Sequence, residues 1–175
     1  MKKLILLLFI LLPFTGLANE DEEPDTLKKK ITRNNVAFNT LGIFAGNLSL
    51  SYERFSPKGY FSIAVPLIIH IIPPEYLFVE GFYNSGIASG AEFNFYPKGK
   101  ARGYLVGASF LMGEFNGNKF YLPMLNNGIL FQHSERINAS AILGLGLISV
   151  MNEGYQKKSS DPFFVRFACN VGYKF

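Results

Sequence analysis

The 175-residue sequence has no tryptophan, one cysteine and two histidines. The single cysteine, Cys169, cannot form an intramolecular disulfide bond. The histidines and the cysteine do not have the spacing of zinc ligands, and no nucleic-acid-binding motif is present, so we expect no metal and no cofactor. The apolar run from Leu4 to about Phe14 is shorter than the roughly 20 residues that a membrane-spanning helix needs, and later apolar runs are interrupted. A helical membrane protein is therefore not expected.

The start of the chain has the composition of a secretory signal peptide, residues 1–18. Lys2 and Lys3 precede the apolar run, and small residues lead to an expected cleavage after Ala18. The residue directly after that position is Asn19 and not a cysteine, so a lipid anchor is not expected there. Residues 19–34 are charged and nearly free of apolar side chains, which predicts a flexible periplasmic lead-in. The small basic excess left after cleavage does not indicate nucleic acid as a partner.

At the end of the chain every odd position is apolar or aromatic, whereas the even positions include Arg166, Asn170 and Lys174, which indicates a strand with one apolar face. The apolar positions are Phe163, Val165, Phe167, Cys169, Val171, Tyr173 and Phe175. From residue 35 to residue 175 we expect one domain with eight strands. Their approximate ranges are 35–42, 46–55, 60–70, 83–96, 102–113, 126–133, 138–150 and 163–174.

The connections between these segments alternate in length. Turns after the second, fourth and sixth strands are short, whereas those after the third, fifth and seventh are long: residues 71–82, 113–123 and 152–162. Short inner turns and longer outer loops are typical of outer-membrane barrels. The sequence therefore predicts an all-β fold, an eight-stranded antiparallel up-and-down transmembrane β-barrel.

The composition of the non-apolar faces predicts which face points inward. In the fourth strand Phe93 and Phe95 are opposed by Gly90, Glu92 and Asn94. Faces of Gly, Ala and Ser suit a narrow lumen better than the outer coat of a soluble protein. We therefore expect the apolar faces to point outward and side chains to fill the lumen.

A few charged residues fall on the expected inner face. Because buried charges persist only when they are paired, we predict a lumen ion-pair network. Its members are Glu53, Glu92, Arg166, Asn94, Ser51 and Asn170.

Aromatic residues gather at the strand ends expected to meet the periplasmic interface. They resemble an aromatic girdle, although aromatic residues are also good strand formers. The predicted girdle comprises Phe55, Phe61, Phe95, Tyr104, Tyr173 and Phe175.

The chain resembles small outer-membrane β-barrels of the OmpA and OmpX type, and more closely the short uncharacterised outer-membrane β-barrel-domain proteins. The resemblance is carried by the strand Asn47–Phe55, the Ser-Pro-Lys turn at residues 56–58 and the strand Tyr60–Val65. It implies a location in the bacterial outer membrane, with lipid as surroundings. It also implies that the terminal pattern ending in Tyr173 and Phe175, with Val171 before them, is recognised by the barrel assembly machinery.

Catalysis has weak support in the sequence. Lipid A deacylases are outer-membrane barrels that use His, Ser and an acidic residue, and here His133, Ser134 and Glu135 are contiguous. Contiguous residues of a strand alternate between faces, so a serine would lie away from its base. We interpret this triplet as a periplasmic turn and His70 as a strand-end residue.

Three functions are compatible with these patterns. The favoured one is a non-enzymatic outer-membrane barrel with a structural role or an extracellular partner bound by its loops. The alternatives are a lipid-modifying enzyme of the outer membrane and a soluble, lipocalin-like barrel that binds an apolar ligand. The lipocalin-like alternative requires Phe93, Leu145 and Phe167 to point inward.

Overall fold

The computed structural model describes residues 32–44, 46–70, 86–115, 117–151 and 163–175. Within these ranges, no helix has the length and apolar character needed to cross a membrane. The elements, in chain order, are β1 (Asn34–Asn39), α2 (Thr40–Phe44), β2 (Asn47–Phe55), β3 (Phe61–His70), β4 (Gly86–Phe95), β5 (Gly103–Phe115), β6 (Asn118–Gln132), β7 (Ile137–Leu147), β8 (Ser149–Met151) and β9 (Phe163–Lys174).

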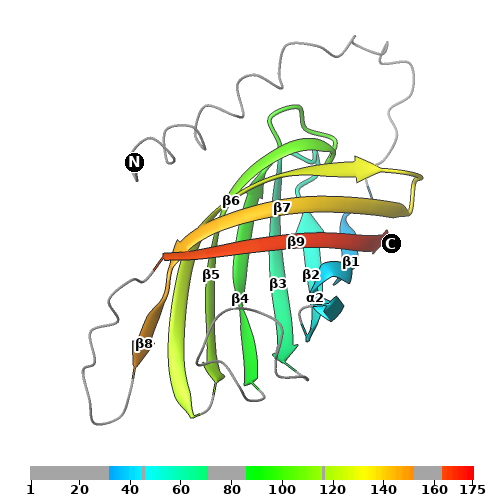
Figure 1. The fold of residues 1–175 in the computed structure, drawn as a ribbon. Coiled ribbons are helices and arrows are strands. Elements are labelled where there is room, and N and C mark those ends of the chain that lie inside the picture. The colour runs from blue at the N-terminus through cyan, green and yellow to red at the C-terminus, as the bar shows by residue number, and fades with distance from the viewer. Residues whose placement is uncertain (1–31, 45, 71–85, 116, 152–162) are drawn as a thin grey trace, which may run out of the picture.

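The strands form one antiparallel sheet that closes on itself. Each strand from β1 to β6 pairs with the next in the chain, and β9 pairs with both β7 and β1. The three-residue β8 follows β7 after Ile148 and pairs with the start of β6. Figure 1 shows the strands curving around a common axis, with β7 and β9 strongly inclined to β3 and β4. The predicted eight-stranded up-and-down barrel is confirmed.

The apolar side chains of the strands lie on the outside of the barrel. Phe93 of β4 is 49% exposed and Phe167 of β9 is 68% exposed, whereas Glu92, between Phe93 and Ala91, is only 5% exposed. The same period of two runs along β3, where Ile63 and Val65 are exposed and Ala64 is buried. The barrel is thus apolar outside, and its interior contains small and polar side chains together with two clusters of larger apolar ones.

Two short turns close the barrel end at which β1 begins, and they hydrogen-bond to each other. The Lys100 and Ala101 N–H groups of the β4–β5 turn donate to the Lys58 and Gly59 carbonyls of the β2–β3 turn, both at 3.0 Å. Gly59 has a φ of 68°, and a Cβ there would lie 2.4 Å from the Ala101 nitrogen. Only glycine suits both the conformation and the close approach.

The first strand is shorter than predicted, because a helix replaces its expected outer end. Asn39 ends β1, and its Oδ1 accepts hydrogen bonds from the N–H groups of Gly42 (3.2 Å) and Cys169 (3.3 Å). Asparagine is a favoured residue at helix N-termini because its side chain can accept such a bond. Thr40 Oγ1 donates to the Cys169 carbonyl at 2.9 Å, so α2 is fixed against β9.

The predicted long loop over residues 113–123 is wrong. In the structure β5 and β6 continue through this stretch and pair as far as Phe115 and Asn118. The period of two persists in Phe120, Leu122 and Met124, which are buried together inside the barrel and favour a strand over a loop. The sixth strand, predicted at 126–133, is consequently much longer. The other two predicted long loops, 71–82 and 152–162, lie outside the described residues.

The seventh predicted strand, 138–150, is also divided in the structure. It comprises β7 and β8, which are separated by Ile148. Ile148 packs against the apolar cluster that contains Phe120. The other strands begin and end close to their predicted limits within the described ranges.

Candidate functional site

The lumen has an apolar cluster near each end and polar side chains between them. Near the short turns the buried cluster is Phe55, Tyr96, Ala101, Leu105 and Leu130. Near the β5–β6 hairpin the cluster is Ala88, Leu111, Phe120, Leu122 and Met124. Because both clusters consist of packed side chains, the polar layer between them is the candidate site.

Glu53 of β2 is the centre of one hydrogen-bonded group. Its Oε1 accepts from the hydroxyls of Ser62 (2.5 Å) and Tyr96 (3.0 Å), and its Oε2 accepts from the Asn35 amide (3.2 Å). The Asn138 amide donates in turn to Asn35 Oδ1 at 2.8 Å. All five side chains are buried. The group therefore connects β7, β1, β2, β3 and the β4–β5 turn around the lumen.

Tyr96 follows β4 and lies in the β4–β5 turn, with 1% of its surface exposed. Burial and the neighbouring charge of Glu53 raise the pKa of Tyr96 well above its usual range. The phenol is therefore protonated at neutral pH and acts as a hydrogen-bond donor to Glu53.

Lys174, the last residue of β9, also points into the lumen and is 2% exposed. Its Nζ donates to the Ala101 carbonyl at 3.3 Å and to Gln132 Oε1 at 3.4 Å. The same ammonium lies 4.9 Å from the centre of the Phe55 ring, within the range of a cation–π contact. Lys174 therefore adds positive charge to the end of the lumen that contains Phe55 and Tyr96.

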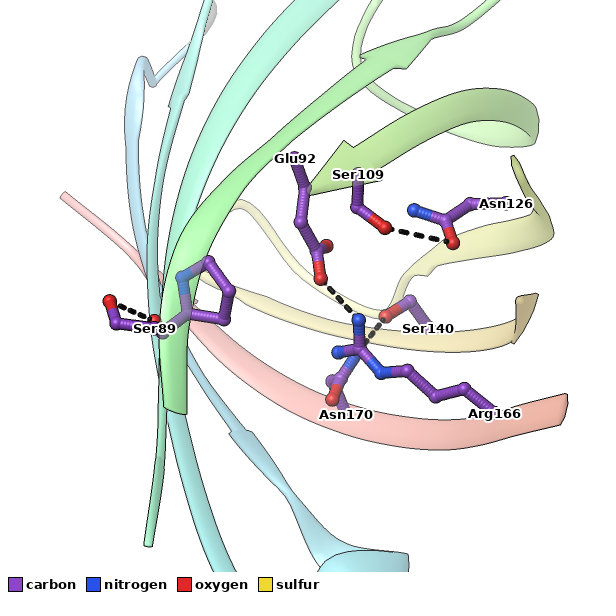
Figure 2. A network of polar contacts seen from close by, with 8 residues as sticks. Ser89, Glu92, Ser109, Asn126, Ser140, Arg166 and Asn170 are labelled. Carbon is purple, nitrogen blue, oxygen red and sulfur yellow. Dashed lines mark hydrogen bonds and ion pairs between the residues drawn. The ribbon is translucent and has the colours of Figure 1, made fainter. Parts of the chain in front are cut away.

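A second polar group lies farther along the lumen. Arg166 Nη1 of β9 forms an ion pair with Glu92 Oε1 of β4, and the two side chains are 13% and 6% exposed. Figure 2 shows this pair reaching across the lumen from opposite walls. In the same view Asn170 donates to Ser140 Oγ at 3.0 Å. With Glu53 and Lys174, the part of the chain that the structure describes places two acidic and two basic side chains in the lumen.

Further hydrogen bonds join neighbouring strands in the same view. Ser109 donates to Asn126 Oδ1 at 3.4 Å, and Ser89 donates to the Pro66 carbonyl at 2.8 Å (Figure 2).

The predicted ion-pair network occurs only in part. Arg166 pairs with Glu92, whereas Glu53 belongs to the separate hydrogen-bonded group described above. Asn94 is 3% exposed, and its Oδ1 has no hydrogen-bond partner among the described residues. Ser51 lines a cavity of about 20 Å³ together with Glu53, Glu92, Asn94 and other polar side chains. Such a volume accommodates about one water molecule.

Several polar side chains of the lumen were absent from the predicted ion-pair network. They are Asn35, Ser62, Tyr96, Asn138, Ser109, Asn126, Ser140 and Lys174. Residue parity is consistent with their inward position: Lys174 shares the even positions of Arg166, and Tyr96 those of Glu92.

Five of the six predicted girdle residues lie on the outer face near the short turns, and Phe55 does not. Phe61 is 45% exposed and its ring packs against Phe93 and Phe95, with ring centres 5.7 and 5.1 Å apart. Phe55 is only 2% exposed and lies inside, 5.9 Å from the Tyr96 ring. The correction follows from parity, because Phe55 shares the inward face of Glu53.

The contiguous triplet His133, Ser134 and Glu135 lies in the β6–β7 turn. Ser134 Oγ accepts hydrogen bonds from the N–H groups of Ile137 (3.0 Å) and Arg136 (3.4 Å), as serine commonly does in turns. His70 ends β3 opposite Gly86. No group of three His, Cys, Asp or Glu side chains suited to a metal occurs within the described ranges.

We expect Tyr96→Phe to destabilise the barrel by about 1.5–3 kcal/mol, because it removes a donor from a buried carboxylate without changing the ring volume. Tyr60→Phe is a matched control, since Tyr60 is 40% exposed in the adjacent turn. Urea unfolding of both variants, followed by circular dichroism, measures the difference. Equal stability of the two variants would mean that the Tyr96 hydroxyl contributes nothing to the Glu53 group.

A scan against protein-family models and searches of curated proteins and of solved structures found no match to this chain.

Proposed function

We propose that the chain is an integral β-barrel of the bacterial outer membrane, exported by a cleaved signal peptide. Its role is non-enzymatic and consists of a structural contribution or binding of an extracellular partner. The observation that carries this proposal is the distribution of side chains across the barrel wall. The outer face is apolar along strands β3, β4 and β9, while Glu53, Glu92, Arg166 and Lys174 point inward.

This distribution is the reverse of that in a soluble ligand-binding barrel. Phe93 and Phe167, which a lipocalin-like barrel would need inside, are among the exposed side chains. The polar layer leaves a cavity of only about 20 Å³. This volume is far below the roughly 300 Å³ of the smallest typical ligand pockets. The geometry therefore favours a membrane barrel with a filled lumen over a carrier of apolar ligands.

The C-terminal strand supports a second part of the proposal, recognition by the barrel assembly machinery. Phe175 is 56% exposed on the outer face, and Val171 and Tyr173 are also exposed. The Phe175 N–H donates to the Asn34 carbonyl at 2.9 Å, so this terminus also closes the barrel against β1. An exposed terminal pattern on the closing strand is accessible before β1 pairs with it.

A partner outside the cell would have to use the end of the barrel opposite the short turns. There β5 and β6 form a tight hairpin, with Gly117 at a φ of 74°. Glu114 and Lys119 are opposite each other in the strand register near its tip, and both are exposed. This hairpin is the described segment best placed for such a contact.

We expect the protein in the outer-membrane fraction, with different electrophoretic mobility in SDS before and after boiling. A closed barrel with paired strands resists SDS until it is heated, whereas an unfolded chain does not change on heating. Measuring both the fraction and the mobility tests the proposal. Recovery in the soluble periplasm with no heat-dependent shift would contradict it.

A further inference from the structure

An apolar furrow runs obliquely across the outer face of the barrel. Its volume is about 340 Å³, and the side chains that line it include Leu41, Tyr104, Asn127, Ala141, Phe167 and Cys169. Pairing places Tyr104 beside Ile129, Ile129 beside Ala141, and Ala141 beside Cys169. The furrow therefore crosses four neighbouring strands.

Small side chains and a helix give the furrow its shape. Ala141 and Cys169 are small, whereas Leu143 and Phe167 beside them are large, so a channel remains between the bulky side chains. At one end α2 is fixed to β9 by the bond from Thr40 Oγ1, which places Leu41 at the furrow. The polar side chains Tyr104 and Asn127 lie toward the other end, which is nearer the short turns.

The barrel end beyond Tyr104 is strongly basic. The exposed charged residues described at that end include one acidic residue, Glu135, and seven basic ones: Arg33, Arg54, Lys58, Lys98, Lys100, Arg102 and Arg136. Arg102 is two residues before Tyr104 and is therefore close to the mouth of the furrow. An anion whose apolar tail lies in the furrow would meet this positive charge.

We propose that the furrow and the basic rim together bind an anionic phospholipid of the periplasmic leaflet, an inference that rests on the proposed membrane location. One acyl chain lies along the furrow from Tyr104 toward Leu41. The phosphate lies at the rim near Arg102, where basic side chains interact with anionic lipid. Tyr104 lies between them, at the depth where aromatic side chains are enriched in membrane proteins.

The combination of features selects this occupant over an acidic macromolecule. An acidic polypeptide or polysaccharide would satisfy the rim, but it would leave an apolar channel of about 340 Å³ unused. A neutral lipid would fill the channel without using the basic excess. Only an amphiphile with a negative headgroup uses both.

The absence of tryptophan allows a direct test. Phe167→Trp introduces a single fluorophore at the furrow, and Phe93→Trp is a matched control on β4, on the opposite wall, where the ring is also exposed. The full chain without its signal peptide is refolded into two sets of phosphatidylcholine vesicles. One set contains a small fraction of phosphatidylglycerol with brominated acyl chains, and the other contains the same fraction of phosphatidylcholine with brominated acyl chains. The ratio of quenching by the two brominated lipids is compared at each position, so that differences in the depth of the two tryptophans within the bilayer do not affect the result.

We expect brominated phosphatidylglycerol to quench the furrow tryptophan at least about twice as effectively as brominated phosphatidylcholine, and this ratio to be smaller at the control position, which lies outside the furrow. Arg102→Glu should reduce the furrow ratio toward one, whereas Arg54→Glu, on β2, should preserve it. Equal quenching by both lipids at the furrow would overturn the proposal while leaving the membrane location intact. Absence of quenching at both positions would instead refute the membrane location itself.

Discussion

Replacing Arg166 with methionine should destabilise the barrel by about 3–5 kcal/mol, because removal of one partner leaves a buried charge uncompensated. The remaining carboxylate, Glu92, is 5% exposed, and the Arg166 side chain is its ion-pair partner. Methionine retains much of the apolar stem of arginine, so the expected loss comes mainly from the charge. Urea unfolding in lipid vesicles, monitored by circular dichroism, gives the free energy of unfolding.

The double variant Glu92→Gln/Arg166→Met distinguishes the effect of losing the whole ion pair from the effect of leaving the Glu92 charge without its partner. Because buried ion pairs can be replaced at little net cost, we expect the double variant to be more stable than Arg166→Met alone. Arg54→Met is the matched control, since Arg54 is exposed on β2. If Arg166→Met and Arg54→Met have equal effects, the pair does not contribute to stability.

The alternation of apolar residues predicted the strands of the barrel, and the composition of the opposite faces predicted which face points outward. A period of two decides which residues share a face, and small or charged residues on the other face indicate a narrow lumen. The same rule would have placed Phe55 and Lys174 inside, where the structure has them. Residue type misled for Phe55, because a phenylalanine near a strand end more commonly lies at a membrane interface.

Pairing across the lumen could not be read from the sequence. Glu53 and Arg166 are on the inner face, but the stagger between strands decides which residues meet at the same height. That stagger brings Arg166 to Glu92 and leaves Glu53 with Ser62 and Tyr96. The extended β5–β6 hairpin was missed for another reason: Gly and Asn in residues 113–123 indicated a loop, while tertiary packing of Phe120 favoured a strand.

The sharpest test of the membrane location is an arginine in the middle of the outer face. Val65 lies near the centre of β3 and is 50% exposed. If lipid surrounds this face, Val65→Arg should cost about 2–4 kcal/mol of unfolding free energy in vesicles, as arginine does at the midplane of transmembrane barrels. At a water-exposed surface the same substitution usually changes stability by less than about 0.5 kcal/mol.

A second arginine near the rim provides the depth control. Ile137 begins β7 and is 46% exposed, almost as much as Val65, but it lies beside the short β6–β7 turn. There the expected cost is only about 0–1 kcal/mol, because arginine near the interface reaches water and headgroups. A large difference between the two variants requires a medium that changes with depth, which only a bilayer provides. Equal small effects at both positions would mean that water covers the apolar face, and the proposed function would have to be abandoned.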